Sequence, residues 1–317
     1  MEPLATESTL REDEGSCVGT SALRTGCLCH ARADSEALPN HSRRLFSSLL
    51  LAGTMAPLAD PASAADPECK RSAVAGLVPA ASVESMARQQ YQQLVREAQS
   101  KSALAPPDDP QLQRLRYIAA RIIPLAPACN ERAREWRWEV QLLRSNQLNA
   151  FCMPGGKIAF FSGILSRLKL SDDEVAVIMG HEAGHALLEH ARERVAKSGS
   201  TSFGLRALAA VFGLGSLGDM AAQATSQLIS LKFSRDDESE ADALGLLLCA
   251  RAGYDPRAGV SLWQKMGAAN AGKAPPAWLS THPAGPERIK EIEARLPRVL
   301  PEFQRAPAPD RRFPVAA

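Results

Sequence analysis

The chain has little net charge, no long run of basic residues and no internal repeat. Its 317 residues carry a formal net charge of only +2, which argues against the strongly basic surface of nucleic-acid-binding proteins. Without a repeat, a solenoid or a propeller is not expected. The apolar content of 45% is ordinary for a packed core. We therefore expect a globular protein that does not bind nucleic acids.

The start of the chain lacks an apolar run long enough to cross a bilayer. Residues 42–65 instead have the order of a signal peptide, with basic, apolar and then small residues: Arg43, Arg44, residues 49–53, Ala62 and Ala64. The basic pair also resembles a twin-arginine signal, so either the Sec or the twin-arginine route is expected. Residues 1–41 do not fit a signal, and translation starting near Leu38 would give one of ordinary length. We expect an exported, periplasmic protein.

The cysteines match no zinc-binding CxxC pattern. Three of the seven fall in the leader, and four remain in the mature part: Cys69, Cys129, Cys152 and Cys249. In an oxidising compartment these four can form two disulfides, and buried free thiols are the alternative. The sequence does not separate the possible pairings.

Apolar residues recur at helical spacing in two segments near the start of the mature part. The first pattern covers residues 82–102, and the second covers residues 112–122 and ends at Pro124. From residue 162 onward the pattern is helical almost throughout. Most of the mature chain is therefore predicted to be helical.

Strands are predicted only between these helical parts. Residues 136–142 alternate between apolar and polar side chains, which is typical of a half-buried strand. Two further short strands, residues 149–152 and 158–161, flank a turn at Pro154-Gly155-Gly156. We predict an α+β fold with a small, mostly antiparallel sheet packed on a helical body.

The segment His181-Glu182-Ala183-Gly184-His185 has the residue types and spacing of a metal site. A capping box at residues 171–174 should start its helix, and Gly199 should end it. Residues four apart on a helix face the same way, so His181 and His185 can hold one metal ion. Glu182 then lies beside the ion, where it can take a proton from a water molecule that the metal activates. The alternative is two histidines on a solvated helix face.

A catalytic zinc ion needs a third protein ligand from elsewhere in the fold. The metzincin extension is missing, because Leu188 and Ala191 stand where its glycine and histidine would be. Glu189 and His190 lie too far along the same helix to close the site. They are predicted to be surface residues.

The acidic cluster at residues 234–242 is the remaining candidate for the third ligand. It opens another predicted helix, on which Glu238 and Asp242 share one face while Glu240 points nearly the opposite way. Glu238 is therefore predicted as the ligand, and Asp242 as the group that orients a ligand histidine. The alternative is a solvated helix start that the helix dipole favours.

Four segments carry a family resemblance: Asn149-Ala150-Phe151 with Pro154-Gly155-Gly156, His181 to His185, Ser234 to Asp242, and Ser280-Thr281-His282-Pro283 with Arg288. They resemble the zinc metalloendopeptidases of the BepA, LoiP and HtpX type, the family that includes the CAAX prenyl proteases. The resemblance covers about residues 82–297 of an expected single domain, residues 66–317. The chain shows neither paired transmembrane segments nor a helical-repeat tail, so a single-domain periplasmic protease of the LoiP type is expected.

The resemblance implies a mainly helical, zincin-like fold of the gluzincin kind. It also implies one zinc ion per chain, bound by His181, His185 and Glu238, with Glu182 as the general base. In relatives a histidine that matches His282 lies near the metal, so His282 is expected either to donate to the oxyanion or to gate the zinc. An ordinary residue at a helix start is the alternative for His282.

The expected activity is hydrolysis of peptide bonds in unfolded or misassembled envelope proteins. An extended substrate that pairs with the strand at Asn149, Ala150 and Phe151 would favour such proteins. Residues 203–218 are apolar and rich in glycine, and are predicted to form a lid, a segment that touches the membrane peripherally, or core. A non-catalytic periplasmic chaperone or assembly factor stabilised by zinc, and a metal-binding scaffold with a closed site, stay open as other functions. The sequence predicts neither the cleavage specificity nor the oligomeric state.

Overall fold

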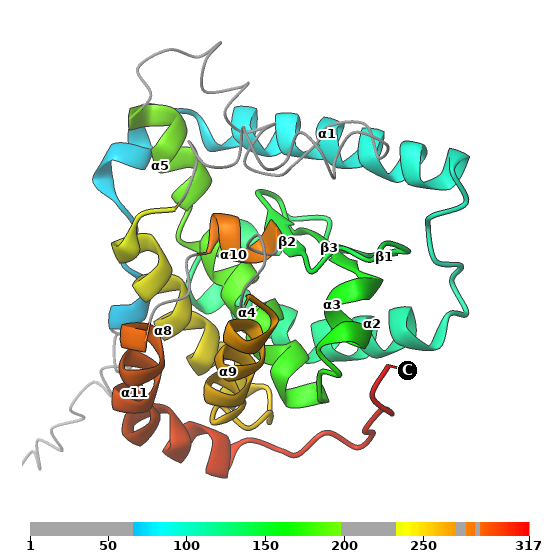
Figure 1. Cartoon of the computed structure of the whole chain (residues 1–317). Coiled ribbons are helices and arrows are strands. Elements are labelled where there is room, and N and C mark those ends of the chain that lie inside the picture. The colour runs from blue at the N-terminus through cyan, green and yellow to red at the C-terminus, as the bar shows by residue number, and fades with distance from the viewer. Residues whose placement is uncertain (1–65, 198–232, 271–276, 283–285, 317) are drawn as a thin grey trace, which may run out of the picture. The chain divides into compact units, whose positions relative to one another are not determined.

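A computed structural model describes residues 66–197, 233–270, 277–282 and 286–316 (Figure 1). All of them fall within one compact unit, Ala59–Ala317. The predicted signal peptide and the apolar segment at residues 203–218 lie outside the described residues. No helix in the described part of the chain combines the length and apolar character needed to span a bilayer.

Two helices precede the sheet, as their apolar spacing predicts. Helix α1 covers Ala80–Ser100, and α2 covers Pro110–Ile122. The carboxylate of Asp109 caps α2 by accepting from two of its first backbone amides. Four short 3-10 turns surround these helices: η1 (Pro67–Cys69), η2 (Ala73–Leu77), η3 (Ile123–Ala128) and η4 (Glu131–Arg134).

The sheet has three strands: β1 (Glu139–Leu143), β2 (Ala150–Met153) and β3 (Lys157–Phe161). Gly155 and Gly156 adopt φ values of 84° and 74° in the β2–β3 turn, which favour glycine. The strand order is β1-β3-β2, so the hairpin inserts β3 between its partner and β1. Strands β2 and β3 are antiparallel, but β1 and β3 are parallel. The sheet is therefore mixed rather than mostly antiparallel, while the predicted α+β class is confirmed.

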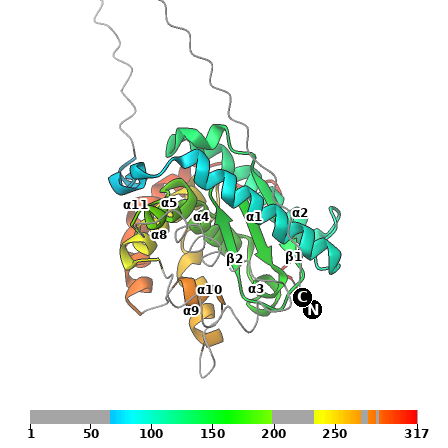
Figure 2. The same ribbon diagram turned by 90° about the horizontal axis from the view of Figure 1, so that it is seen from above.

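Both faces of the sheet are buried, because alternate side chains enter two clusters. Residues on one face pack against α1: Leu143, Phe151, Met153, Ala159 and Phe161. Residues on the other face join the main core with α2 and with α4 (Asp172–Leu187): Val140, Leu142, Ala150, Cys152, Ile158 and Phe160. Figure 2 shows α1 running across the strands. The sheet thus forms a layer between α1 and the helical body.

The helical body consists of α4 and six other described helices: α3 (Ser162–Arg167), α5 (His190–Lys197), α8 (Arg235–Arg251), α9 (Ala258–Asn270), α10 (Ala277–Thr281) and α11 (Pro286–Arg305). Helix α4 begins at the predicted capping box of Ser171 and Glu174. The predicted single helix to Gly199 is wrong, because α4 ends at Leu187. Glu189 has a φ of 62°, a left-handed value that ends the helix before α5 starts in a new direction.

Helices α4 and α8 pack with their backbones in contact. A Cβ atom on Gly180 would lie 2.6 Å from the carbonyl oxygen of Gly245. One on Gly245 would lie 2.6 Å from the amide nitrogen of His181. Neither position has room for a side chain, so the two glycines set the distance between the helix that carries the histidines and the helix that carries the acidic cluster.

The start of α4 is held from two sides. The guanidinium of Arg114 on α2 donates to the Asp172 carboxylate over 2.6 Å, and both side chains are buried. The backbone amide of Phe313 donates to the other oxygen of Asp172 over 2.8 Å. These contacts fix the first turn of the helix on which His181 and His185 lie.

Of the four cysteines in the described part, two form a disulfide and two are buried free thiols. Cys69 and Cys129 form a disulfide that ties η1 to the end of η3, 60 residues along the chain. Cys152 and Cys249 are buried free thiols. Burial raises the pKa of both thiols, so they remain protonated.

Candidate active site

His181 and His185 lie one turn apart on α4 and are both buried. Their Nε2 atoms are 3.1 Å apart, so both imidazoles present the same nitrogen to one point. The small spacing between the rings follows from the helix, since residues four apart lie on the same face. The alternative of two histidines on a solvated face is wrong.

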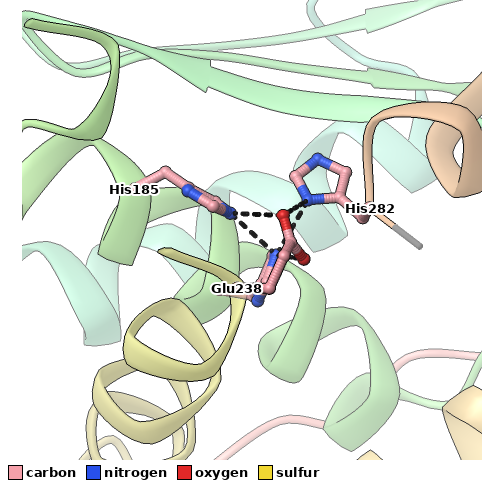
Figure 3. A group of neighbouring side chains, drawn as sticks. His185, Glu238 and His282 are labelled. Atoms are coloured by element: carbon pink, nitrogen blue, oxygen red, sulfur yellow. Dashed lines mark hydrogen bonds and ion pairs between the residues drawn. The ribbon is translucent and has the colours of Figure 1, made fainter. Parts of the chain in front are cut away.

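Glu238 and His282 complete the group of candidate metal ligands. Carboxylate oxygens of Glu238 on α8 lie 3.6 Å from Nε2 of His181 and 3.5 Å from Nε2 of His185. Nδ1 of His282, which directly follows α10, lies 2.9 Å from Glu238 Oε1. Figure 3 shows His185, Glu238 and His282 pointing toward one another.

This donor set fits a metal ion. One ligand atom from each of the four residues lies within 4.8 Å of the others, and all four side chains are buried. Imidazole nitrogens and a carboxylate oxygen are the donors that Zn²⁺ accepts in catalytic sites. The structure thus brings together the three predicted ligands and adds His282 as a fourth donor.

Asp242 and Arg288 lie behind the ligands. An oxygen of Asp242 is 2.9 Å from Nδ1 of His181, where a carboxylate fixes the tautomer that leaves Nε2 free. Arg288 on α11 donates to Asp242 over 2.6 Å and to Glu238 over 2.5 Å. The buried guanidinium thus orients both the candidate ligand Glu238 and the carboxylate that contacts His181.

The pKa shifts of His185 and Glu238 favour the charge states that bind a metal. The pKa of His282 shifts the other way, because, against the effect of burial, the charges of Glu238 and Glu182 raise it. Burial lowers the pKa of His185 well below its ordinary value. Burial also acts strongly on Glu238 in the opposite sense, but the charges of His282 and Arg288 and hydrogen bonds from the two histidines hold its pKa well below the usual range. A neutral imidazole and an ionised carboxylate are the forms that ligate metals.

Glu182 lies beside the cluster and not in it. The indole nitrogen of Trp278, on α10, donates to Glu182 Oε1 over 2.6 Å. The same oxygen lies 3.5 Å from Nε2 of His282. The carboxylate is thereby fixed next to the ligand atoms, at the position expected of a proton acceptor.

A pocket opens onto this group from the sheet. It is lined by residues of β2, α4, α10 and the segment before α8, including Asn149, Ala150, Phe151, Glu182, His185, Phe233 and His282. Strand β2 lies at the edge of the sheet, next to the pocket. The predicted substrate strand therefore borders the candidate metal ligands directly.

Two further predictions about this region are wrong. Glu189 and His190 are not surface residues, since their exposed fractions are 7% and 1%. The break in the helix turns His190 inward instead. Glu240 is exposed, and its carboxylate reaches His190 over 3.2 Å.

Two residues of the site, Trp278 and Arg288, were given no role from the sequence. Trp278 precedes His282 by four residues, the spacing that places two side chains on one face of a helical turn. That spacing is a signal that could have indicated Trp278. Arg288 has no comparable local signal, because its partners lie on α8.

Comparisons with known proteins agree with this geometry. The model of Peptidase family M48 matches residues 112–296, more than half of the chain. The chain belongs to peptidase family M48. The mitochondrial metalloendopeptidase OMA1 of Arabidopsis thaliana is 41% identical over 153 residues, which are 48% of this chain and 30% of that protein. OMA1 of Schizosaccharomyces pombe is 38% identical over 167 residues, 51% of this chain and 47% of that protein.

A bacterial M48 relative covers more of its own length. The metalloprotease LoiP of Escherichia coli is 27% identical over 214 residues, which are 64% of this chain and 78% of LoiP. The chain spans less than half the length of the two OMA1 proteins. What the relatives share with this chain is a metallopeptidase domain, and its His and Glu cluster can hold the metal on which that family depends.

Proposed function

We propose that the protein is a zinc-dependent endopeptidase that cleaves unfolded or misassembled proteins of the bacterial envelope. The observation that carries the proposal is the position of Glu182, held by Trp278 beside a buried cluster of three histidines and one glutamate. A structural zinc site would not require a carboxylate fixed next to the ligands but outside them. The names of the M48 relatives support peptidase activity.

In the proposed mechanism His181, His185 and Glu238 hold the zinc ion. Zinc, when bound, would supply Lewis acidity that activates water and polarises the scissile carbonyl. Glu182 accepts the proton of the attacking water and passes it to the leaving amine. His181 is kept in the ligand tautomer by Asp242, and Asp242 is kept ionised by Arg288.

His282 is proposed to gate the site. Its Nδ1 atom lies within the ligand group, 3.1 Å from Nε2 of His181. A side chain in that place would compete with water and substrate for the open position of the metal. This arrangement favours gating over donation to an oxyanion, because Nδ1 of His282 lies among the ligand atoms and its Nε2 lies 3.5 Å from Oε1 of Glu182.

The edge of β2 is proposed to bind the substrate backbone. The amide of Phe161 donates to the carbonyl of Asn149, so alternation along the ladder turns the backbone groups of Ala150 and Cys152 away from β3. The Ala150 amide donates to the side chain of Asn149, which a substrate carbonyl would replace. Only an extended segment can pair in this way, so unfolded chains are selected over folded ones.

A direct test uses the mature protein, residues 66–317, and its Glu182→Gln variant. We expect the wild type to bind one zinc ion and to cleave casein, and a chelator to abolish cleavage. Glu182→Gln should keep the zinc and lose roughly 100-fold or more in rate. A zinc-loaded wild type that leaves casein intact, or a Glu182→Gln variant that is fully active, contradicts the proposal. Full complementation by Glu182→Gln in cells would instead support a chaperone.

A further inference from the structure

His190 lies in the core because the chain breaks its helix just before it. Glu189 adopts a left-handed φ of 62°, which costs free energy for a residue with a side chain. The cost is tolerated where surrounding contacts require the conformation. Here the turn places the His190 ring, which is 1% exposed, with its centroid 5.0 Å from that of His185.

The contacts of His190 link a metal ligand to a carboxylate. Its Nδ1 atom lies 2.9 Å from Nδ1 of His185, and its Nε2 atom lies 3.2 Å from Oε2 of Glu240. The Glu240 carboxylate can only accept, so in a neutral His190 the Nε2 atom carries the proton and the Nδ1 atom is the acceptor. Nδ1 of His185 must then be the donor.

That tautomer is the one a metal ligand needs. The Nε2 atom of His185 faces the ligand group, at 3.1 Å from Nε2 of His181. With its proton on Nδ1, His185 has the lone pair of Nε2 free for a metal ion. His181 reaches the same state through Asp242, whose oxygen lies 2.9 Å from its Nδ1. Each of the two histidines on α4 is thus backed by a carboxylate, directly for His181 and through His190 for His185.

We propose that His190 and Glu240 are positioning residues that orient His185 and fix its tautomer for metal binding. The inference rests on the proposed metal site but does not require that the site be a peptidase. Partners of ligand histidines typically contribute 10-fold to 100-fold to metal affinity. Phe233 stacks on a face of the His185 ring, with centroids 4.1 Å apart. Packing therefore restrains the plane of His185, while His190 decides which nitrogen carries the proton.

The test measures zinc affinity by competition with a chromophoric chelator, using mature full-length protein. Four variants are compared with the wild type: His190→Ala, His190→Gln, Glu240→Ala and Glu293→Ala. Gln can accept a hydrogen bond from His185, so His190→Gln tests rescue by a residue that keeps an acceptor. Glu240 and Glu293 are both exposed glutamates on helices, so Glu293→Ala on α11 is a matched control for Glu240→Ala.

We expect His190→Ala to weaken zinc binding at least 10-fold and Glu240→Ala to weaken it several-fold. His190→Gln should stay within about 3-fold of the wild type, and Glu293→Ala should not differ from it. The absorption spectrum of the cobalt-loaded protein should change for His190→Ala and not for Glu293→Ala. Unfolding of metal-free Glu240→Ala should match the wild type, which separates positioning from a general loss of stability.

Zinc affinities of His190→Ala and Glu240→Ala that equal the affinity of the wild type, with an unchanged cobalt spectrum in His190→Ala, overturn the proposal. If His190→Ala does not fold, the comparison of Glu240→Ala with Glu293→Ala still decides it, because an equal affinity of these two contradicts the link to His185. Wild-type protein that binds zinc but cleaves no peptide leaves this inference intact and rejects the proposed function alone.

Discussion

The indole N–H of Trp278 is bonded to the carboxylate of Glu182, with 2.6 Å between Nε1 and Oε1. Both residues are buried, so the bond holds the proposed base in one orientation. Trp278→Phe keeps the aromatic packing and removes the donor. We expect kcat/KM to fall by roughly 10-fold at unchanged zinc content, since one buried hydrogen bond to a charged group is worth about 1.5–3 kcal/mol.

Trp136 offers a matched control for Trp278→Phe. Its indole nitrogen also donates to a glutamate, Glu84 of α1, over 3.0 Å, but neither residue lines the pocket at the candidate metal ligands. Trp136→Phe should lose a similar hydrogen bond and leave kcat/KM unchanged. Equal effects of the two substitutions would show that the Trp278 contact acts only through stability.

The glycine contact between α4 and α8 should not tolerate a methyl group. In Gly245→Ala the new Cβ would meet the His181 backbone at 2.6 Å, so the helices must separate. We expect a loss of about 1–3 kcal/mol in the free energy of unfolding and weaker zinc binding, because the ligands lie on both helices. A Cβ atom on Gly267 of α9 would meet no other atom within 4 Å, so Gly267→Ala should stabilise by roughly 0.5–1 kcal/mol. Urea unfolding with and without zinc measures both.

The pair of Asp242 and Arg288 should make the metal-free protein sensitive to acid. Burial raises the pKa of Asp242, but the charge of Arg288 and hydrogen bonds from His181 and Arg288 outweigh it, so the folded-state pKa lies below the ordinary value. The stabilisation is therefore present above the unfolded pKa of about 3.9 and is lost as the pH falls through the folded pKa. Asp242→Asn should cost about 3 kcal/mol near neutral pH and progressively less below pH about 4.

Asp255 serves as the control for this pH dependence. Its pKa is also lowered, against the effect of burial, by Arg257, but that partner is exposed. Asp255→Asn should change the free energy of unfolding by no more than about 1 kcal/mol at any pH. A cost for Asp242→Asn that stays constant from neutral pH to pH 3 would contradict the assignment.

Metal removal should lower stability, because the ion would tie together His181, His185 and Glu238. An ion that binds only the folded state stabilises it by about 2.7 kcal/mol at a concentration 100-fold above its Kd. We expect a chelator to lower the melting temperature of the wild type and to leave that of His185→Ala unchanged. Calorimetry at matched protein concentration measures both melting temperatures. An equal decrease in the wild type and in His185→Ala would show that the metal binds elsewhere.

Reduction of the Cys69–Cys129 disulfide should destabilise the protein without changing its affinity for zinc. The bond closes a loop of 60 residues, for which the loop-entropy relation gives roughly 4 kcal/mol. The variant with serine at both positions should unfold at lower denaturant concentration and keep its zinc affinity. Thiol titration of the native protein should find the two buried cysteines, Cys152 and Cys249, only after unfolding.

Local patterns predicted most of the elements and the side chains that the structure gathers into the candidate metal site. Helical spacing identified α1, α2 and the start of α4, and the positions of His181, His185, Glu238 and Asp242 followed from one-face arguments on two helices. Strand pairing was not predictable in the same way. The direction of pairing depends on which strand of the β2–β3 hairpin lies next to β1, and the local pattern of each strand does not contain that information.

The inward turn at Glu189 had no signal in the sequence. Neither glycine nor proline occurs at residues 187–192, and the helical spacing of apolar residues continues through them to Val195. The break is imposed by tertiary contacts, among them those of His190 with His185 and Glu240. Helix propensity cannot report such contacts, because they join residues from different elements.

The contact of Gly180 with Gly245 also bears on how the protein would take up its ion. Because the backbones of α4 and α8 are in direct contact, the two helices cannot slide past each other. The imidazoles and the carboxylate therefore keep the same positions without an ion. Uptake should then proceed in a single kinetic step that requires no refolding. The far-ultraviolet circular dichroism spectrum should stay the same through repeated cycles of demetallation and reloading.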